Sequence, residues 1–156
     1  MAGESTLLTQ YYPDDFDIVS FQFNTSSGGS LNDPTPLLYA DRNLIIDTII
    51  VGVVNTGGTS AAASFEQASN PNATNGTVVA VAAIDGTNAA AGDTIVLTTD
   101  GVTRSNGGTA TTTTGNSAID RTTNFIPKGN WLIIDVTGTL SSANITVQIR
   151  YRSRPK

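Results

Sequence analysis

The chain has 156 residues, a net charge of −5 and only 13% charged residues, with neither cysteine nor histidine. Its length suits one domain. The two missing residue types exclude a disulfide framework, thiol nucleophiles, the usual structural zinc sites and the commonest general base. The negative charge also argues against nucleic acid as a partner.

Residues 1–15 are predicted to form an N-terminal arm. Leu7, Leu8, Tyr11 and Tyr12 supply apolar contact surface there, and a proline turn separates them from the next run. The start of the chain lacks the basic and apolar regions of a signal peptide, so we expect synthesis in a cytosol without secretion. No run approaches the ~20 apolar residues that cross a membrane.

Alternating apolar and polar residues predict a strand over residues 16–24, and a loop with glycines and prolines follows at 25–36. The run at 44–54, LIIDTIIVGVV, is apolar on both faces, which is typical of a central strand between two layers. Asp47 interrupts this run, and we expect it near an end or at a rim.

The middle of the chain is rich in small residues. Residues 60–68, SAAASFEQA, lack a capping box and a helical apolar stripe, so we interpret them as a strand, with a short helix as the alternative. Strands are also predicted over 77–84 and 94–99, each followed by an Asp-Gly turn. Residues 107–115 form either a mobile loop or an edge strand of threonines.

The clearest alternation lies near the end of the chain. Residues 131–136 and 145–151 each place apolar side chains on one face, as half-buried strands do. A turn at 138–142 separates the two runs. They are therefore predicted to pair as a terminal hairpin.

Seven or eight short strands with turn residues about every ten positions, and no convincing helix, predict an all-β fold. We expect a single antiparallel β-sandwich or jelly roll of about eight strands over residues 16–151. The arm precedes it at 1–15, and a short basic tail follows at 152–156.

Charge is unevenly distributed along the chain. Arg150, Arg152, Arg154 and Lys156 provide half of the eight cations, whereas the first seventeen residues carry four carboxylates and no cation. The acidic start and the basic end could attract each other, or each could bind a partner. The alternative is that the tail is simply solvated.

Catalytic motifs are missing from the sequence. There is no phosphate-binding glycine motif and no G-x-S-x-G elbow, and most aspartates stand beside Gly, Pro or Asn, where they cap turns. Calcium is the one metal worth weighing, because acidic residues cluster at 14–17 and Asp85 and Asp93 flank a Gly/Asn loop, although no EF-hand loop is present. We therefore expect a non-enzymatic chain with no cofactor and no bound metal.

Trp131 and the tyrosines raise the possibility of sugar binding, since aromatic faces stack on sugar rings. The alternative, which we favour, is that Trp131 packs into the second sheet or into a subunit contact.

The segment FIPKGNWLIIDVTG at 125–138, followed by NITVQIRYR at 144–152, resembles the C-terminal half of small jelly-roll virion proteins of tailed bacteriophages. In that group a Pro-x-Gly turn precedes an alternating strand, and the last strand ends in basic residues. The run at 44–54 resembles the first long core strand of the same group. The low charge and the high Thr, Gly, Ala and Asn content are similar to those of capsid decoration (cement) proteins.

This resemblance implies a non-enzymatic structural protein on the outer face of a phage capsid, produced in the host cytoplasm. It implies a homotrimer that clamps subunits of the major capsid protein, without nucleic acid or membrane as partners. Flexible arms suit such contacts because they order on binding, and aromatic and arginine side chains usually dominate interfaces. The candidate contact residues are Leu7, Leu8, Tyr11, Tyr12, Arg150, Arg152 and Arg154. The alternative function is a carbohydrate- or host-receptor-binding β-sandwich of a phage fibre or tail tip.

Overall fold

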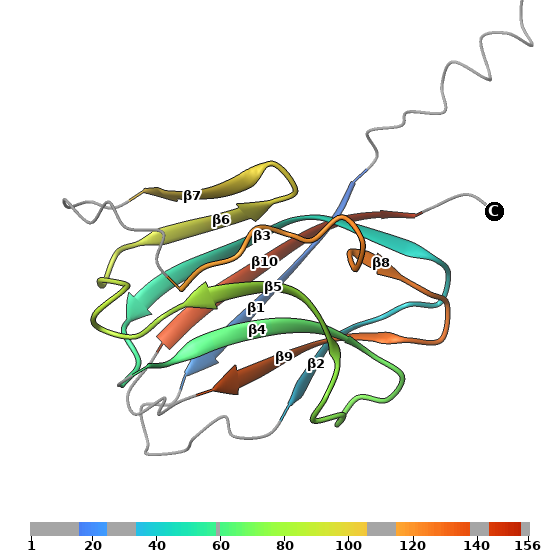
Figure 1. The fold of residues 1–156 in the computed structure, drawn as a ribbon, viewed down its shortest axis with the longest axis horizontal. Coiled ribbons are helices and arrows are strands. Elements are labelled where there is room, and N and C mark those ends of the chain that lie inside the picture. Colours follow the sequence, from blue (N-terminus) through green and yellow to red (C-terminus); the bar gives the residue numbers. More distant parts are fainter. Residues whose placement is uncertain (1–15, 25–33, 59, 106–114, 138–143, 154–156) are drawn as a thin grey trace, which may run out of the picture.

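The structure is a computed structural model that describes residues 16–24, 34–58, 60–105, 115–137 and 144–153. Ten strands form two facing sheets (Figure 1). Within the described ranges no helix is long and apolar enough to cross a membrane. The strands are β1 (Asp17–Asn24), β2 (Thr35–Tyr39), β3 (Leu44–Asn55), β4 (Ala62–Ala68), β5 (Thr77–Ala83), β6 (Thr94–Thr98), β7 (Gly101–Ser105), β8 (Phe125–Ile126), β9 (Trp131–Thr137) and β10 (Asn144–Ser153).

Sheet A has the order β1-β10-β3-β6-β7, with the short β8 pairing one end of β3, and sheet B has the order β2-β9-β4-β5. Every pair of named strands is antiparallel. The predicted antiparallel β-sandwich is therefore confirmed. The chain crosses between the two sheets several times, and this strand order is compatible with a jelly roll.

The core lies between the sheets and follows the predicted alternation. On β10, Ile145, Val147 and Ile149 are buried, whereas Thr146 and Gln148 face solvent. From sheet B, Phe65 is fully buried and is the largest side chain of the core. The chain has no disulfide, so this apolar contact between the layers is the main source of its stability.

β3 occupies the central position that its apolar run predicted, between β10 and β6. Asp47 is the fourth residue of this twelve-residue strand, and its side chain is partly exposed. A register shift explains how the strand accommodates a carboxylate. Arg150 pairs with Thr48 and Tyr151 pairs with Ile46, so Asp47 is the extra residue of a bulge.

The predicted terminal hairpin is wrong. β9 pairs with β2 and β4 in sheet B, whereas β10 pairs with β1 and β3 in sheet A. Both strands have an apolar face, and these faces meet across the core instead of the strands meeting edge to edge. The segment 138–143 between them lies outside the described residues.

Three strands were absent from the sequence prediction: β2, β7 and the two-residue β8. β2 begins at Thr35, inside the predicted loop at 25–36, and contains Pro36. Proline is tolerated there because β2 is an edge strand and pairs only with β9. β7 follows the Asp-Gly turn after β6 and completes a hairpin that the turn signal marked. The alternative strand at 107–115 lies almost wholly outside the described residues.

The alanine-rich segment at 60–68 is a strand, as predicted, and not a helix. β4 lies between β9 and β5. Its residues Ala63 and Phe65, two positions apart, both belong to the core. β10 also continues to Ser153, past the predicted sandwich boundary at residue 151.

The free edge of β5 is covered by residues 116–120, which we call the edge cover. The Ser117 N–H donates to the Val81 carbonyl at 2.9 Å, and the Ser117 hydroxyl oxygen accepts from the Val81 N–H at 2.8 Å. Asn116 Oδ1 accepts from the Ala83 N–H at 2.8 Å. The backbone groups of this edge are therefore satisfied within the chain.

Candidate functional site

The candidate site lies where β1 begins and β10 ends. Asp17 lies opposite Tyr151 in the antiparallel pair, so the start of β1 lies beside the last residues of β10 (Figure 1). The two predicted contact segments are therefore attached to the same end of sheet A. Arg150 and Arg152 lie on β10, whereas Leu7, Leu8, Tyr11, Tyr12 and Arg154 lie outside the described residues.

Phe16 brings the start of the chain onto the basic residues of β10. The guanidinium carbon of Arg150 lies 3.6 Å from the centroid of the Phe16 ring, and that of Arg152 lies 6.0 Å from it. A cation over an aromatic face contributes about 0.5–1 kcal/mol at an exposed site. The Nε of Arg152 is buried without a hydrogen-bond partner. Sequence reasoning did not select Phe16, because its partners depend on the pairing of β1 with β10.

Arg150 is also held from the β3 side by the bulge residue Asp47. The Arg150 Nε lies 3.6 Å from Asp47 Oδ2, and both side chains are partly exposed. The Thr48 hydroxyl donates to the same carboxylate oxygen at 2.8 Å. An ion pair with this exposure is worth at most about 1 kcal/mol, so Arg150 is positioned but is still available to a partner.

Charges of both signs surround this end of the sandwich. Arg42 Nε donates to Asp41 Oδ1 at 3.1 Å on the exposed turn before β3. Burial raises the pKa of the Tyr151 hydroxyl, and the Asp17 and Asp41 carboxylates raise it further while Arg42 opposes them. Tyr151 is therefore neutral at physiological pH. The described part of this end is therefore a surface of mixed charge.

Asp85, one of the carboxylates weighed as calcium ligands, is engaged by its own loop, whereas Asp14 and Asp15 lie outside the described residues. Asp85 Oδ1 accepts from the backbone N–H groups of Thr87 at 2.8 Å and of Asn88 at 3.0 Å, and the Asn88 side chain donates to both oxygens. Burial raises the pKa of Asp85, but these hydrogen bonds outweigh it and lower the pKa below its ordinary value. In the ranges that the structure describes, no three acidic residues are grouped to hold a metal.

Asp93 forms a buried ion pair with Arg104. The Arg104 Nε donates to Asp93 Oδ2 at 2.7 Å, its Nη2 donates to the same oxygen, and its Nη1 donates to the Asn88 carbonyl. The side chains are 3% and 0% exposed. The Ala90 N–H also donates to Asp93 Oδ2, whereas Asp93 Oδ1 has no hydrogen-bond partner. This pair fixes the loop between β5 and β6 to β7.

Glu66 is the remaining buried acid, on the outer side of sheet B. Its Oε1 accepts from the Ser64 hydroxyl at 2.7 Å, and its Oε2 accepts from the Gly76 N–H at 2.9 Å. A Cβ on Gly76 would lie 2.7 Å from the Glu66 Cβ, so the loop approaches the strand as closely as only glycine allows. The carboxylate therefore holds the loop between β4 and β5.

Trp131 lies in the second sheet, against Tyr39. The two residues are paired across β2 and β9, and their ring centroids are 4.8 Å apart at an angle of 52°. Tyr39 is 50% exposed. An aromatic pair with one open ring is the feature that the sugar-binding alternative requires.

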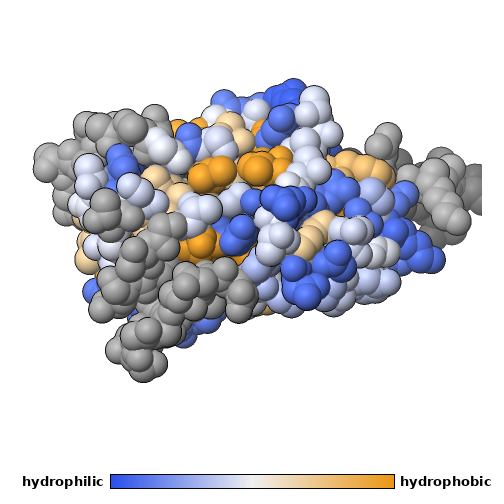
Figure 2. All heavy atoms as spheres, turned by 60° about the horizontal axis from the view of Figure 1, so that its bottom comes forward, coloured by the Kyte–Doolittle hydropathy of each residue, from blue (hydrophilic) through white to orange (hydrophobic). Residues whose placement is uncertain are grey.

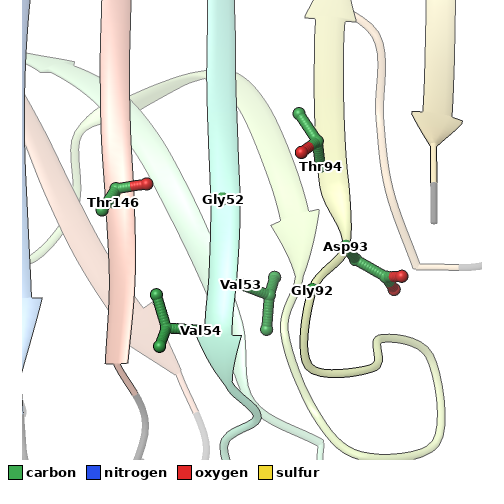
Figure 3. Close-up of a pocket in the computed structure, with 7 residues that line it drawn as sticks. All are labelled: Gly52, Val53, Val54, Gly92, Asp93, Thr94 and Thr146. Carbon is green, nitrogen blue, oxygen red and sulfur yellow. The ribbon is translucent and has the colours of Figure 1, made fainter. Parts of the chain in front are cut away.

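An open hollow of about 430 Å³ lies on the outer side of sheet A. Gly52 forms its floor between Thr146 and Thr94, which pair with it from the two neighbouring strands (Figure 3). A Cβ on Gly52 would lie 2.5 Å from the Thr146 Oγ1. Asp93 is at the margin, with its carboxylate turned away from Gly52 (Figure 3). The hollow thus offers hydroxyl groups and small apolar side chains without a converging charge.

Exposed apolar residues are scattered over the described surface. The large ones are Ile18, Tyr39, Val54 and Val78. The face shown in Figure 2 has its apolar groups separated by polar ones.

Comparisons of the chain with protein-family models, with curated proteins and with solved structures gave no match.

Proposed function

We propose that the chain is a non-enzymatic structural protein of a phage virion, which binds the outer face of the capsid and stabilises contacts between major capsid protein subunits. The observation that carries this proposal is the contact between Phe16, just before β1, and the arginines near the end of β10. Phe16, the first residue after the predicted arm, lies next to Arg150, the first cation of the basic stretch, so one partner surface can engage both segments together.

The buried acids support the same proposal. In the described residues, Asp85 and Glu66 accept backbone hydrogen bonds from their own loops, and Asp93 pairs with Arg104. These contacts keep the connections of the sandwich in place. A rigid sandwich with contact segments at one end suits a protein whose task is to hold neighbouring subunits.

Binding to capsids tests the proposal directly. Capsids of the encoding virus, assembled from the major capsid protein alone, are sedimented with the full chain, with a chain lacking residues 1–13, and with Arg152→Ala. We expect the deletion to abolish co-sedimentation and Arg152→Ala to weaken it. Arg121→Ala, which removes an equally positive but exposed side chain elsewhere, is the control and is expected to bind normally. Full binding by the deleted chain refutes the role of the arm.

The open aromatic pair favours one second function, binding of a carbohydrate or host receptor. Tyr39 and Trp131 present a ring surface on which a sugar ring could stack. A glycan screen with Tyr39→Ala tests it, and Tyr39→Phe is the matched control because it retains the ring. Specific glycan binding that is lost only in Tyr39→Ala would favour this function over capsid decoration.

A further inference from the structure

We propose that the free edge of β1 is a self-association surface, which pairs antiparallel with β1 of a second copy of this chain and joins two copies of sheet A into one. β1 pairs with β10 along one side. Along its other side it has no strand partner among the described residues. Such an edge presents unpaired N–H and C=O groups, which bind another strand.

The other edges of the sandwich are less suited to accept a strand. The edge cover bonds to β5, and β2 is interrupted by Pro36 and by a register shift beside it. β7 is only five residues long. The β1 sequence, DIVSFQFN, has eight residues with no proline and no cation, and its one charge is at its first position. It therefore lacks the devices with which edge strands usually avoid pairing.

The inward side of β1 is incompletely buried. Val19, Phe21 and Phe23 pack against the core but are only partly buried, whereas Val147 and Ile149 on the adjacent β10 are fully buried. The rings of Phe21 and Phe23 are stacked with centroids 6.4 Å apart. A further strand beside β1 would remove more of this apolar surface from water, which favours association.

The alternation of side chains restricts the register of the pair. In a continuous sheet, opposite residues lie on the same face. One residue of β1 must therefore lie opposite its own copy, with the two-fold axis midway between the two. An axis at Phe21 places Phe21 opposite its own copy and Val19 opposite Phe23. An axis at Ser20 would instead place the Asp17 carboxylate opposite Phe23. The apolar contacts favour the axis at Phe21.

A second copy is the occupant that this edge fits. The apolar residues Val19, Phe21 and Phe23 then lie opposite the same residues of the other copy, with no charged residue among them. This inference does not depend on capsid binding. It predicts a dimer about a two-fold axis, whereas the resemblance in the sequence implies a trimer. The two states are distinguished by the mass of the isolated protein.

A pair of full-length variants tests both the edge and the register. With the axis at Phe21, Ser20 of one copy faces Gln22 of the other, and both side chains are exposed. Ser20→Lys/Gln22→Lys places like charges opposite each other twice. Ser20→Lys/Gln22→Glu places opposite charges there. Both variants have the same lysine and differ only at position 22, whose neighbour within the chain is the uncharged Thr146.

Sedimentation of each protein over micromolar to submillimolar concentrations, at low ionic strength, gives the dimer dissociation constant. We expect the wild type and the Lys/Glu variant to dimerise, and the Lys/Lys variant to have a dissociation constant about tenfold higher or more. High salt should reduce this difference. Circular dichroism and thermal unfolding confirm that both variants are folded. A monomeric or trimeric wild type, equal dimerisation of the two variants, or loss of the dimer in both would each overturn the proposal.

Discussion

The buried pair of Asp93 and Arg104 gives the sharpest test of how the loops are held. The perturbation is a set of three variants: Arg104→Met, Asp93→Asn and the double variant. Methionine retains most of the length of the arginine side chain without its charge. Asparagine retains the shape of the aspartate and its carbonyl acceptor.

The expected magnitudes follow from burial and from the remaining partners. In Arg104→Met the Asp93 carboxylate, 0% exposed, is left with the Ala90 N–H as its remaining described donor. In Asp93→Asn the Arg104 cation loses its buried carboxylate and retains the Asn88 carbonyl among its partners. Removing one member of a buried ion pair costs about 3–5 kcal/mol, because the other charge is then uncompensated. The double variant has no charge at this buried position, so it should lose only about 1–2 kcal/mol from missing hydrogen bonds.

Thermal and urea unfolding measure these costs. Each single variant should lower the midpoint temperature by about 6–20 °C, for a chain of this size, and the double variant should unfold at a higher temperature than either. The difference between the loss in the double variant and the sum of the losses in the single variants is a coupling free energy of several kcal/mol. If the double variant is as unstable as the sum of the singles, or if Arg104→Met costs less than about 1 kcal/mol, the reasoning from burial is refuted.

Three further predictions follow from the described contacts. Phe65→Ala should cost about 3–5 kcal/mol in urea unfolding because it leaves a cavity in the core, and a loss below about 1 kcal/mol would contradict its central position. Gly52→Ala should destabilise the fold by about 1–3 kcal/mol, because the added Cβ meets the Thr146 hydroxyl. Adding Thr146→Ala should restore most of this loss. Equal stability of Gly52→Ala and the wild type would contradict the prediction. Since the pKa of Asp85 is lowered on folding, its ionised form stabilises the protein above the ordinary aspartate pKa of about 4, and this contribution is lost as the pH falls through the lower folded pKa. The stability difference between wild type and Asp85→Asn should therefore be largest near neutral pH and shrink in acid, and a difference independent of pH would contradict the assignment.

The fold class was predictable because alternation and turn residues are local signals. The alternating runs became β1, β9 and β10, and the two Asp-Gly turns follow β5 and β6 as expected. The pairing of β9 and β10 was not predictable, since alternation shows that a strand has one buried face but not which strands lie beside it. β2 was missed because proline in its middle is a turn signal, and only its edge position permits a strand there.

The candidate site was predictable only in its parts. Clustered cations marked Arg150 and Arg152, and their position on the last strand follows from the alternation. The contact of Phe16 with Arg150 joins residues from opposite ends of the chain, so it requires the pairing of β1 with β10. The bulge that directs Asp47 toward Arg150 depends on the register of β3 and β10, which no local pattern specifies.

The position of β10 between β1 and β3 has a consequence for how the protein is made. This strand leaves the ribosome after every other described strand, yet it belongs in the interior of sheet A. Until β10 is available, β1 has no described neighbour in its sheet, and the edge of β3 that pairs with β10 is open. Sheet A therefore cannot be completed until β10 has been made, and its assembly depends on pairing β10 with two strands that are far from it in the sequence.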